Sequence, residues 1–545
     1  MNPKDMEKSV RKNILSLTPY STARDECGMD AEVYLDANEN PYDNGFNRYP
    51  DPHQKLLKRK ISEKKGIPED MIFIGNGSDE AIDLVFRIFC RPGIDNAVSI
   101  APTYGMYKVA AAINDVEFRE VPLRDDFSLD CKALTDAADS NTRLMFICSP
   151  NNPTGNSFPM EEILKIAGSF DGIVVLDEAY IDFSSLPSLA PMTASVQNLI
   201  VLQTFSKAWG MAGLRVGMAF AAPWIIRLMS NIKYPYNINS ITQKIVMQRL
   251  REDPGQAITA IRKERERISS AIQDCPGVIR VYPSDANFIL VKFVDPDATF
   301  RKLTGCGIIV RDRSRVAGCE GCLRITVGTP SENELLIDVL RGGKSQSVSP
   351  GKAACRNSSV FRATSETAVT AMVDLDGKGP SFISTGIGFF DHMLDQIVHH
   401  AGISLLVYAE GDTEVDEHHT VEDVAIVLGK AVSQALGDKV GIGRYGFTLP
   451  MDESEATVLM DLGGRIDFRW NATFRREKIG DMPTEMFSHF FKSFAETAGC
   501  NLHITAEGEN EHHKIEGIFK AFARALKMAV AKGDGASLPS SKGIL

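Results

Sequence analysis

The stretch RLMFICSPNNPTGNSFPMEEILKIAGSFDGIVVLDEAY (143–180) indicates the architecture of the first half of the chain. Two short apolar segments, 143–150 and 172–180, lie on either side of a segment, 160–170, whose apolar residues recur at helical spacing. A strand, a helix and a second strand in this order are typical of a parallel sheet. A further apolar segment at 198–206 continues the alternation. The sequence therefore predicts an α/β domain with a mainly parallel sheet.

Polar side chains follow these apolar segments, and parallel sheets place their sites at the carboxyl ends of strands. Asn152 follows the first segment, Asp177 and Tyr180 end the second, and Lys207 follows the third. Pyridoxal phosphate needs a lysine amine to bond with its aldehyde, a carboxylate against its ring nitrogen, and donors for its ring oxygen. Lys207, Asp177 and the pair Asn152 and Tyr180 are the candidates for these three tasks.

The phosphate of such a cofactor needs hydroxyls, backbone amides and a cation. Ser206, Arg215 and the turn GNGSDE (75–80), which contains Ser78 and Asp79 and opens a helical segment, meet this need. Taken singly, the residues have plainer interpretations, because a lysine after a strand is usually solvated and an aspartate there is often a helix cap. The clusters together, in this order, favour a cofactor site.

Residues 1–345 resemble the fold-type-I pyridoxal-phosphate aminotransferases, and among them the histidinol-phosphate aminotransferase family. The resemblance is carried by LDANENP (35–41), RYPDP (48–52), GNGSDE (75–80), APTYGMY (101–107), CSPNNPTG (148–155), LDEAY (176–180), TFSKAWGMAGLRVG (204–217) and LRITVGT (323–329). It implies a dimer in which Tyr104 stacks on the cofactor ring and Tyr49 reaches the site of the partner subunit. It also implies that four residues contact the substrate, with the two arginines holding its anion: Tyr20, Asn40, Arg311 and Arg324.

Histidine marks the second half of the chain as a unit with different chemistry. Only His53 lies among the first 391 residues, whereas the other nine histidines fall between His392 and His513. The stretch GGKSQSVSPGKAACRNSS (342–359) separates the two halves and has the composition of a linker. We therefore expect an aminotransferase at 1–345, a linker at 346–358 and a second domain at 359–545.

The second half contains an internal repeat. GFFDHMLDQIVHHAGISLLVYAEGD (388–412) runs into DEHHTVEDVAIVLGKAV, and EMFSHFFKSFAETAGCNLHITAEGE (485–509) runs into NEHHKIEGIFKAFARAL. This duplication predicts an α+β domain built from two repeated half-domains. Four positions of each copy that carry metal-ligating side chains align, namely His392, His418, His419 and Glu422 with His489, His512, His513 and Glu516.

Adjacent residues on a helix point about 100° apart, so His418 and His419 should face different ions. Glu422 shares a helix face with either histidine. The six histidines and two glutamates divide most simply into two ions with four protein ligands each, which suits Mn, Fe, Zn or Ni. His399, His400 and His503 have no aligned partner, and we expect them to be structural or to lie outside the ligand set.

The second half resembles the imidazoleglycerol-phosphate dehydratase family along almost its whole length, through RATSETAV (362–369), GFFDHML, DEHHTVED, GIGRYG, EHHKIEG and PSSKG. The resemblance implies two Mn²⁺ ions per site, with ligands from different subunits of a large assembly. It places phosphate contacts at Arg444, Arg465, Ser540 and Lys542, with Lys520 close by. Glu366 and Gln396 match substrate-site positions, and Glu366 is the candidate base for the carbon-bound proton.

Together the two resemblances imply a bifunctional enzyme of histidine synthesis that dehydrates imidazoleglycerol phosphate and transaminates the product with glutamate. Three alternatives stay open from the residues: an aminotransferase for another bulky amino acid, a di-metal hydrolase, and a half that serves only in assembly. The pair CEGC (319–322) lacks a second pair to complete a zinc site, so we expect it to be structural.

The bulk composition narrows the class of protein further. A net charge of −11 argues against a general nucleic-acid binder. The N-terminal residues include acids and form no apolar segment of a signal peptide, and no apolar run is long enough to span a bilayer. The ten cysteines are scattered without a disulfide pattern, which predicts a reduced, cytoplasmic protein.

Overall fold

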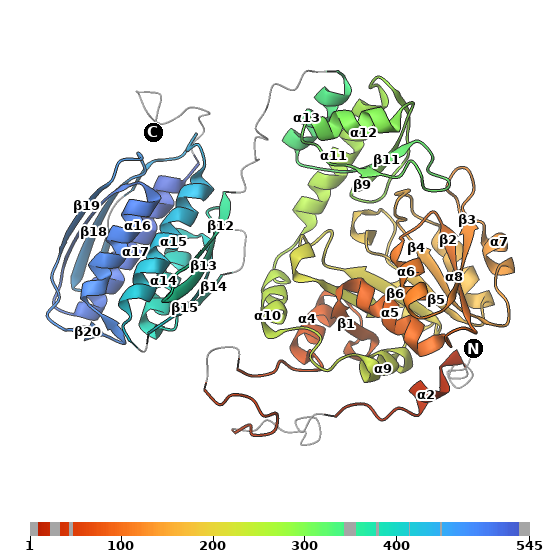
Figure 1. Cartoon of the computed structure of the whole chain (residues 1–545), viewed down its shortest axis with the longest axis horizontal. Coiled ribbons are helices and arrows are strands. Elements are labelled where there is room, and N and C mark those ends of the chain that lie inside the picture. Colours follow the sequence, from red (N-terminus) through yellow and green to blue (C-terminus); the bar gives the residue numbers. More distant parts are fainter. Residues whose placement is uncertain are drawn as a thin grey trace. The chain divides into compact units, whose positions relative to one another are not determined.

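The chain folds into two compact units, Met1–Gly351 and Lys352–Leu545 (Figure 1). The computed structural model describes residues 9–21, 33–42, 47–342, 356–377, 381–413, 415–446 and 449–532. The expected linker at 346–358 lies mostly outside these ranges. Its last two residues belong to strand β12, which begins at Asn357.

A seven-stranded sheet forms the centre of the first unit and is parallel apart from β7, which confirms the predicted α/β class. In spatial order its strands are β1 (Ile72–Asn76), β7 (Val216–Phe220), β6 (Leu199–Thr204), β5 (Ile173–Asp177), β4 (Thr142–Cys148), β2 (Asn96–Ala101) and β3 (Glu117–Pro122). Successive side chains of a strand point to opposite faces. Phe73 accordingly lies in one apolar core, and Ile72 and Ile74 lie in the other.

Helices cover both faces of this sheet. The core that contains Phe73 also contains apolar residues of α5 (Gly77–Phe89), α6 (Met106–Ile113) and α9 (Pro223–Ile232). The opposite core contains residues of α4 (Lys55–Lys65), α7 (Cys131–Asp136), α8 (Met160–Ser169) and α10 (Ser240–Arg249). A short helix, α2 (Lys12–Leu15), precedes them. The carboxyl ends of the parallel strands are thereby held in fixed positions, where the candidate site lies.

A second, antiparallel sheet completes the first unit. Its order is β10 (Arg311–Asp312), β11 (Cys322–Thr326), β9 (Phe288–Phe293) and β8 (Val278–Val281). Its apolar core is shared with α11 (Gly255–Gln273), α12 (Pro296–Gly305) and α13 (Pro330–Leu340). α13 begins with a capping box, in which Thr329 and Glu332 satisfy each other's backbone amides.

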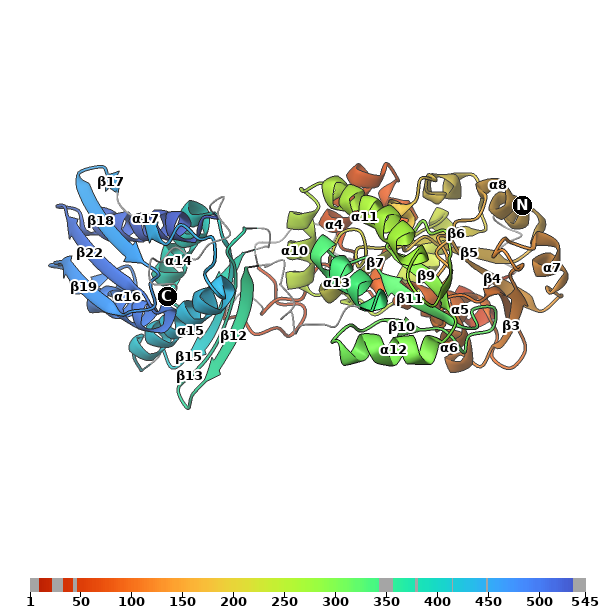
Figure 2. The ribbon, with the colours of Figure 1, turned by 90° about the horizontal axis from the view of Figure 1, so that it is seen from above.

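The second unit is a layer of four helices between two sheets (Figure 2). One sheet has the order β12 (Asn357–Ala363), β13 (Thr367–Asp374), β15 (Ser404–Gly411) and β14 (Phe382–Ser384). The other has the order β16 (Tyr445–Gly446), β18 (Ser454–Asp461), β22 (Asn501–Glu507) and β19 (Asp467–Ala472), with β17 (Leu449–Met451) also beside β18. The helices are α14 (Gly388–Ala401), α15 (His418–Leu436), α16 (Glu485–Ala498) and α17 (Glu511–Val530). β20 (Lys478–Ile479) and β21 (Met482–Pro483) form a separate hairpin.

The two halves of this unit repeat the same order of elements, which confirms the predicted duplication. β13 and β18 both span eight residues and α14 and α16 both span fourteen. In each half the strand that follows the eight-residue strand pairs in parallel, β14 with β15 and β19 with β22. One continuous apolar core joins the two halves, so the repeats form a single folded body.

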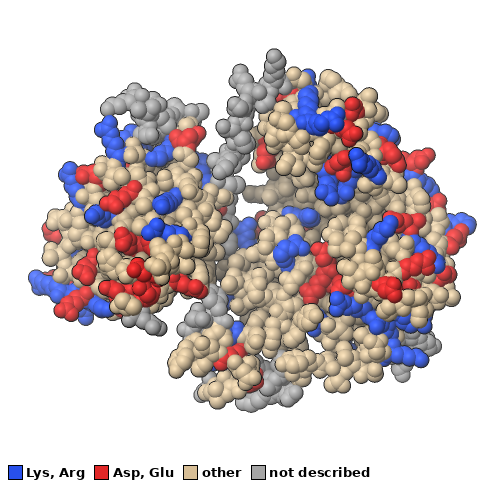
Figure 3. All heavy atoms as spheres, in the orientation of Figure 1, with Lys and Arg blue, Asp and Glu red and all other residues tan. Residues whose placement is uncertain are grey.

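Two further features concern the surface of the protein and the length of its helices. On the face drawn in Figure 3, acidic and basic side chains are interspersed over both units. In the part of the chain that the structure describes, no helix has the length and apolar character needed to cross a membrane.

Candidate cofactor pocket and candidate metal centre

A pocket that is partly open to solvent lies at the carboxyl ends of β4, β5 and β6 in the first unit. It is lined by nine residues that the sequence singled out: Ser78, Asp79, Tyr104, Asn152, Asp177, Tyr180, Ser206, Lys207 and Arg215. Segments up to 137 residues apart in the chain thus contribute to one cavity, as the parallel topology requires.

Asp177 ends β5 and is only 2% exposed. Burial raises the pKa of its carboxyl group, whereas hydrogen bonds from the Tyr107 hydroxyl and the Ala179 amide lower it. The Tyr107 hydroxyl donates to Asp177 Oδ2 at 2.7 Å from helix α6, and Tyr107 is completely buried. Sequence reasoning missed Tyr107, and its one signal was its place at the end of the APTYGMY segment, three residues after Tyr104. The two donors fit a carboxylate that has to stay ionised against a ring nitrogen.

Lys207 lies close to the same carboxylate and to two cations. Burial lowers the pKa of its amine, the Arg324 guanidinium lowers it further, and Asp177 opposes both effects. Its Nζ lies 5.5 Å from the centre of the Tyr180 ring. The unprotonated amine, which is the nucleophilic form, is therefore more populated here than in a solvated lysine.

Ser78 and Asp79 belong to the first turn of α5, because that helix begins at Gly77. The expected turn at 75–80 is therefore shorter than the sequence suggested. The start of the helix lines the pocket, and an anion is favoured at a helix N-terminus. Gly217 is required nearby, since a side chain there would overlap the backbone of Gly77 and Ser78. Arg215 adopts a left-handed conformation with φ 53°, and its guanidinium lies 3.4 Å from Asp79 and from Ser206 Oγ.

Arg324, one of the two expected anion-binding arginines, contacts Asn152, which is a candidate donor for the ring oxygen. The Asn152 amide donates to the Tyr180 hydroxyl at 3.5 Å, and Arg324 donates to the Asn152 carbonyl oxygen. Arg311 is the cross-strand partner of Arg324 in the small sheet. The pocket therefore combines a cavity, a nucleophilic amine, a buried carboxylate and an anion end, and this donor set fits pyridoxal phosphate.

Five of the residues expected in this site do not line the pocket. Two are Arg311 and Arg324 of the small sheet, and the other three precede α4, namely Tyr20, Asn40 and Tyr49. Tyr20 is 73% exposed, and Asn40 accepts a hydrogen bond from the Tyr42 amide. Tyr49 stacks on Tyr236 with ring centres 4.4 Å apart. Within a single chain the structure does not bring these last three residues to Lys207.

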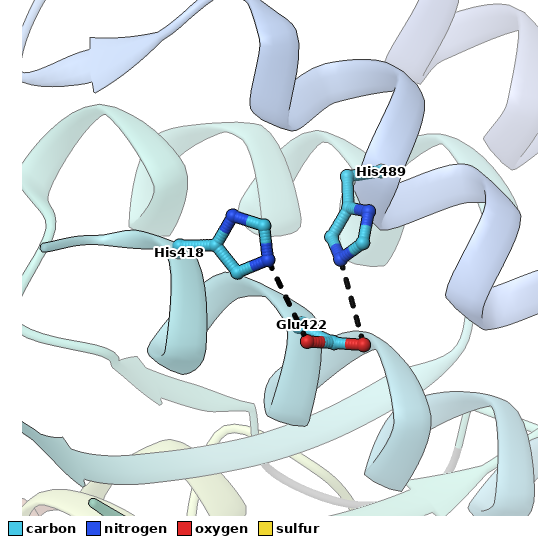
Figure 4. Close-up of side chains that lie close together, drawn as sticks. All are labelled: His418, Glu422 and His489. Carbon is cyan, nitrogen blue, oxygen red and sulfur yellow. Dashed lines mark ion pairs between the residues drawn. The ribbon is translucent and has the colours of Figure 1, made fainter.

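In the second unit, His418, Glu422 and His489 converge from two neighbouring helices (Figure 4). His418 and Glu422 lie one turn apart on α15, with His418 Nε2 3.7 Å from Glu422 Oε2. His489 projects from α16, and its Nε2 lies 3.5 Å from the other oxygen of Glu422. The two imidazole rings are 4.5 Å apart between centres. The cluster joins the first repeat to the second within one chain.

His489 Nε2 is buried and makes no hydrogen bond within the described residues. A buried polar nitrogen without a hydrogen bond is costly, and a metal ion at the centre of the cluster would satisfy it. Two imidazoles and a carboxylate form a donor set that suits a divalent transition metal such as Mn²⁺. The residues present therefore fit the metal that the resemblance implies.

The second histidine of each pair is turned toward a different carboxylate. His419 Nδ1 lies 3.3 Å from Asp412 and 3.7 Å from Glu366. His513 Nδ1 lies 3.0 Å from Glu453. Glu366 directly precedes β13 and Glu453 directly precedes β18, so the two glutamates occupy equivalent positions in the repeats. Sequence reasoning missed Glu453, although alignment of the two eight-residue strands would have found it.

The remaining predicted ligands are only partly assembled. His512 Nε2 lies 3.7 Å from Glu516, which repeats the relation between His418 and Glu422. Among the described residues, His392 joins no close group of three possible ligands. One cluster of the expected pair is thus seen within the chain, and its counterpart is half formed.

The expected phosphate and substrate residues of the second unit are dispersed. Arg444 is paired with Asp461, Lys520 with Glu516, and Arg465 is exposed. Gln396 lies on α14, one turn after His392. Ser540 and Lys542 lie outside the described residues.

The CEGC pair is buried in a small apolar cluster with Phe127 and Leu290. Burial raises the pKa of Cys319 to about 12 and that of Cys322 to about 11. Both residues are free thiols. This environment agrees with a packing role, because thiolates, not thiols, ligate metals.

Each of the two units matches a family of known proteins. Residues 22–340 match the family model of aminotransferase class I and II, and residues 385–526 match that of imidazoleglycerol-phosphate dehydratase. The chain therefore belongs to the aminotransferase class I and II family, and its second unit carries an imidazoleglycerol-phosphate dehydratase domain.

Two relatives are more specific about the first unit. Histidinol-phosphate aminotransferase of Parabacteroides distasonis is 51% identical over 343 residues, which cover 63% of this chain and 99% of that protein. Histidinol-phosphate aminotransferase of Flavobacterium psychrophilum is 45% identical over 344 residues, with 63% and 99% covered.

Solved structures agree on the fold of the first unit. The histidinol-phosphate aminotransferase of Clostridium acetobutylicum superposes with a TM-score of 0.51 at 22% identity, covering 55% of this chain and 90% of that one. The enzyme of the same name from Sinorhizobium meliloti, in complex with pyridoxal-5'-phosphate, gives a TM-score of 0.51 at 23% identity, with 61% and 97% covered.

Proposed function

We propose that the chain is a bifunctional enzyme of histidine synthesis. It dehydrates imidazoleglycerol phosphate to imidazole-acetol phosphate and transaminates this ketone with glutamate, which yields histidinol phosphate. The observation that carries the proposal is the presence, on one chain, of the pocket around Lys207 and Asp177 and of the cluster formed by His418, Glu422 and His489. The product of the second unit is then the substrate of the first.

In the first unit, bound pyridoxal phosphate supplies an electron-accepting ring and an aldehyde that exchanges amino groups. Lys207 would hold the cofactor through that aldehyde, and its Nζ would move a proton at the reacting centre once substrate is bound. Asp177 holds the proton on the ring nitrogen, and Tyr107 fixes the carboxylate. Asn152 and Tyr180 donate to the ring oxygen.

The anion end of the pocket orients the substrate. Arg311 and Arg324 bind the phosphate of the ketone in one half-reaction and the distal carboxylate of glutamate in the other. Guanidinium groups suit both anions, because each presents two parallel donors. Tyr20, Asn40 and Tyr49 are proposed to act on the pocket of a partner subunit in a dimer.

In the second unit, Mn²⁺ supplies Lewis acidity that draws electron density from the substrate imidazole. His418, Glu422 and His489 hold one ion, and the repeat-related His392, His512 and Glu516 hold the other. His419 and His513 complete the two ligand sets through contacts between chains of a larger assembly. Glu366, exposed beside His419, is the proposed base that takes the carbon-bound proton.

Arg444, Arg465, Ser540 and Lys542, with Lys520 near them, are proposed to bind the phosphate of this substrate, and Gln396 to contact the substrate. We further propose that the protein works in the cytoplasm. Two other functions compete, namely transamination of another bulky amino acid by the first unit and metal-dependent hydrolysis by the second.

Single substitutions separate the two activities. Lys207→Ala should abolish transamination of imidazole-acetol phosphate and leave dehydration at the wild-type rate, because the units have separate sites. Glu422→Gln should do the reverse, and should also lower the bound Mn²⁺ measured on the purified protein. Glu496→Gln, at the far end of α16 and exposed, is the control and should change neither activity.

The alternatives give different results in the same assays. A hydrolase would release inorganic phosphate or another hydrolysis product from imidazoleglycerol phosphate. An aminotransferase for aromatic amino acids would have a higher kcat/KM for phenylalanine than for histidinol phosphate. Either result would contradict the proposal.

A further inference from the structure

A third arginine lies on the same face of the small sheet as Arg311 and Arg324. Arg311 pairs with Arg324 and Asp312 with Leu323 across the antiparallel ladder. The Arg313 amide donates to the Cys322 carbonyl oxygen at 3.0 Å, so the pairing continues one residue further. Side chains alternate along a strand, which places Arg311 and Arg313 on the face of Arg324. Asp312 takes the opposite face with Leu323.

This face looks toward the cofactor pocket. Arg324 extends from this face and donates to Asn152. Cys322 and Leu290 lie on the same face and pack against Phe127, which follows β3 of the larger sheet. Burial raises the pKa of Tyr180, and the guanidinium groups of both Arg324 and Arg313 lower it. Arg313 is therefore close enough to the pocket for its charge to act on a pocket residue.

In the part of the chain that the structure describes, none of the three arginines forms an ion pair. The carboxylate of Asp312, next to Arg313 in the chain, accepts from the Ser314 amide. The Nε atoms of Arg313 and Arg324 are buried and make no hydrogen bond within the same ranges. Burial and the like charges of Arg324 and Arg311 lower the pKa of Arg313. Arg313 and Arg324 are half-buried and Arg311 is exposed beside them, and like charges at such a site are favourable only with an anion nearby.

We propose that Arg313 is a third anion-binding arginine of the aminotransferase pocket, and that it favours the phosphate of the ketone and of histidinol phosphate over the carboxylate of glutamate. A phosphate monoester carries nearly two negative charges at neutral pH and three acceptor oxygens, whereas a carboxylate carries one charge and two oxygens. Two arginines satisfy the carboxylate, and the third finds an acceptor only on the phosphate. This specificity role rests on the proposed function of the first unit.

The test compares the two half-reactions of the holoenzyme in separate single-turnover assays, with histidinol phosphate in one and glutamate in the other. Arg313→Gln should lower kcat/KM for histidinol phosphate about tenfold or more and that for glutamate about threefold or less, because a lost positive charge weakens binding of a dianion more. Inorganic phosphate should also inhibit the glutamate half-reaction more weakly in the variant. Arg315→Gln, an exposed arginine two residues on, is the matched control and should behave as wild type.

An equal loss for both substrates would assign Arg313 a structural role, and no loss for either would place it outside the site; both results overturn the inference. If Arg313→Gln does not fold, Arg313→Lys carries the same test, since it keeps the charge but loses the two-pronged donor, and its loss must again be larger for the phosphate substrate. Failure of the wild type to accept histidinol phosphate would instead overturn the proposed function.

Discussion

Tyr107 donates its hydroxyl hydrogen to Asp177 at 2.7 Å, and both residues are shut off from solvent. This contact lowers the pKa of Asp177, against the larger effect of burial. Tyr107→Phe removes the donor and raises that pKa, so less of the carboxylate is available to hold a proton on the ring nitrogen. A hydrogen bond to a charged group contributes about 1.5–3 kcal/mol, so we expect kcat of transamination to fall about tenfold or more.

The measurement is steady-state transamination with the affinity for pyridoxal phosphate determined in parallel. Tyr408→Phe is the control, because it removes an exposed tyrosine-to-carboxylate hydrogen bond in the second unit. Unchanged kinetics in Tyr107→Phe would show that the hydrogen bond from Tyr107 is not required for the function of Asp177.

Close backbone packing around Gly217 holds the proposed phosphate end of the pocket. Gly217→Ala places a methyl group against the backbone of Gly77 and Ser78, which cannot move without displacing the start of α5. Overpacking of this kind costs about 1–3 kcal/mol, so affinity for pyridoxal phosphate should fall by at least about tenfold. At Gly213 the space that an added methyl group would occupy is open, so Gly213→Ala should bind the cofactor normally. Equal affinities in the two variants, from absorbance titration, would disprove this role.

The environment of Lys207 predicts a pH dependence of cofactor uptake. Burial and the Arg324 charge lower its pKa from the ordinary lysine value of 10.5. Because the unprotonated amine reacts with the aldehyde, the uptake rate of cofactor-free enzyme should reach half its maximum at a pH below that value. Arg324→Gln removes a cation that disfavours protonated Lys207, so the pKa rises and the midpoint moves to higher pH. Arg280→Gln should leave the midpoint in place, and a downward shift in Arg324→Gln would contradict the sign.

Glu453 gives the second unit a positioning residue. Its carboxylate accepts from His513 Nδ1 at 3.0 Å, which would leave Nε2 free for a metal ion. Loss of such an outer contact lowers metal affinity by about 10- to 100-fold, so Glu453→Gln should bind Mn²⁺ more weakly by that factor. Glu455→Gln, two residues on and exposed, should bind as wild type. A competition assay with a chelator measures both, and equal affinities would remove Glu453 from the site.

Local patterns in the sequence predicted the elements of the first unit well. Helical spacing located α8 almost to the residue, and the apolar runs located β4, β5 and β6, because each pattern reflects a face buried against the sheet. The pocket residues could be found because parallel strands bring their carboxyl ends together. Tyr107 could not, because its contact with Asp177 depends on how α6 packs on the sheet.

The metal cluster shows a different limit of sequence reasoning. Alignment of the repeats pairs His489 with His392, and helix geometry separates His418 from His419. Neither argument says that His489 of one copy lies beside His418 of the other, since that follows from the packing of α15 against α16 in the common core. Glu453 was not predicted from the sequence because the turns before β13 and β18 share little sequence beyond that glutamate.

One reaction tests the proposed function most directly. The purified chain, loaded with pyridoxal phosphate and Mn²⁺, is given imidazoleglycerol phosphate and glutamate, and the products are followed by mass spectrometry. We expect histidinol phosphate and 2-oxoglutarate in equal amounts, with imidazole-acetol phosphate as the transient species. Accumulation of imidazole-acetol phosphate without histidinol phosphate, or release of inorganic phosphate with neither product, would contradict the assignment of consecutive reactions to this chain.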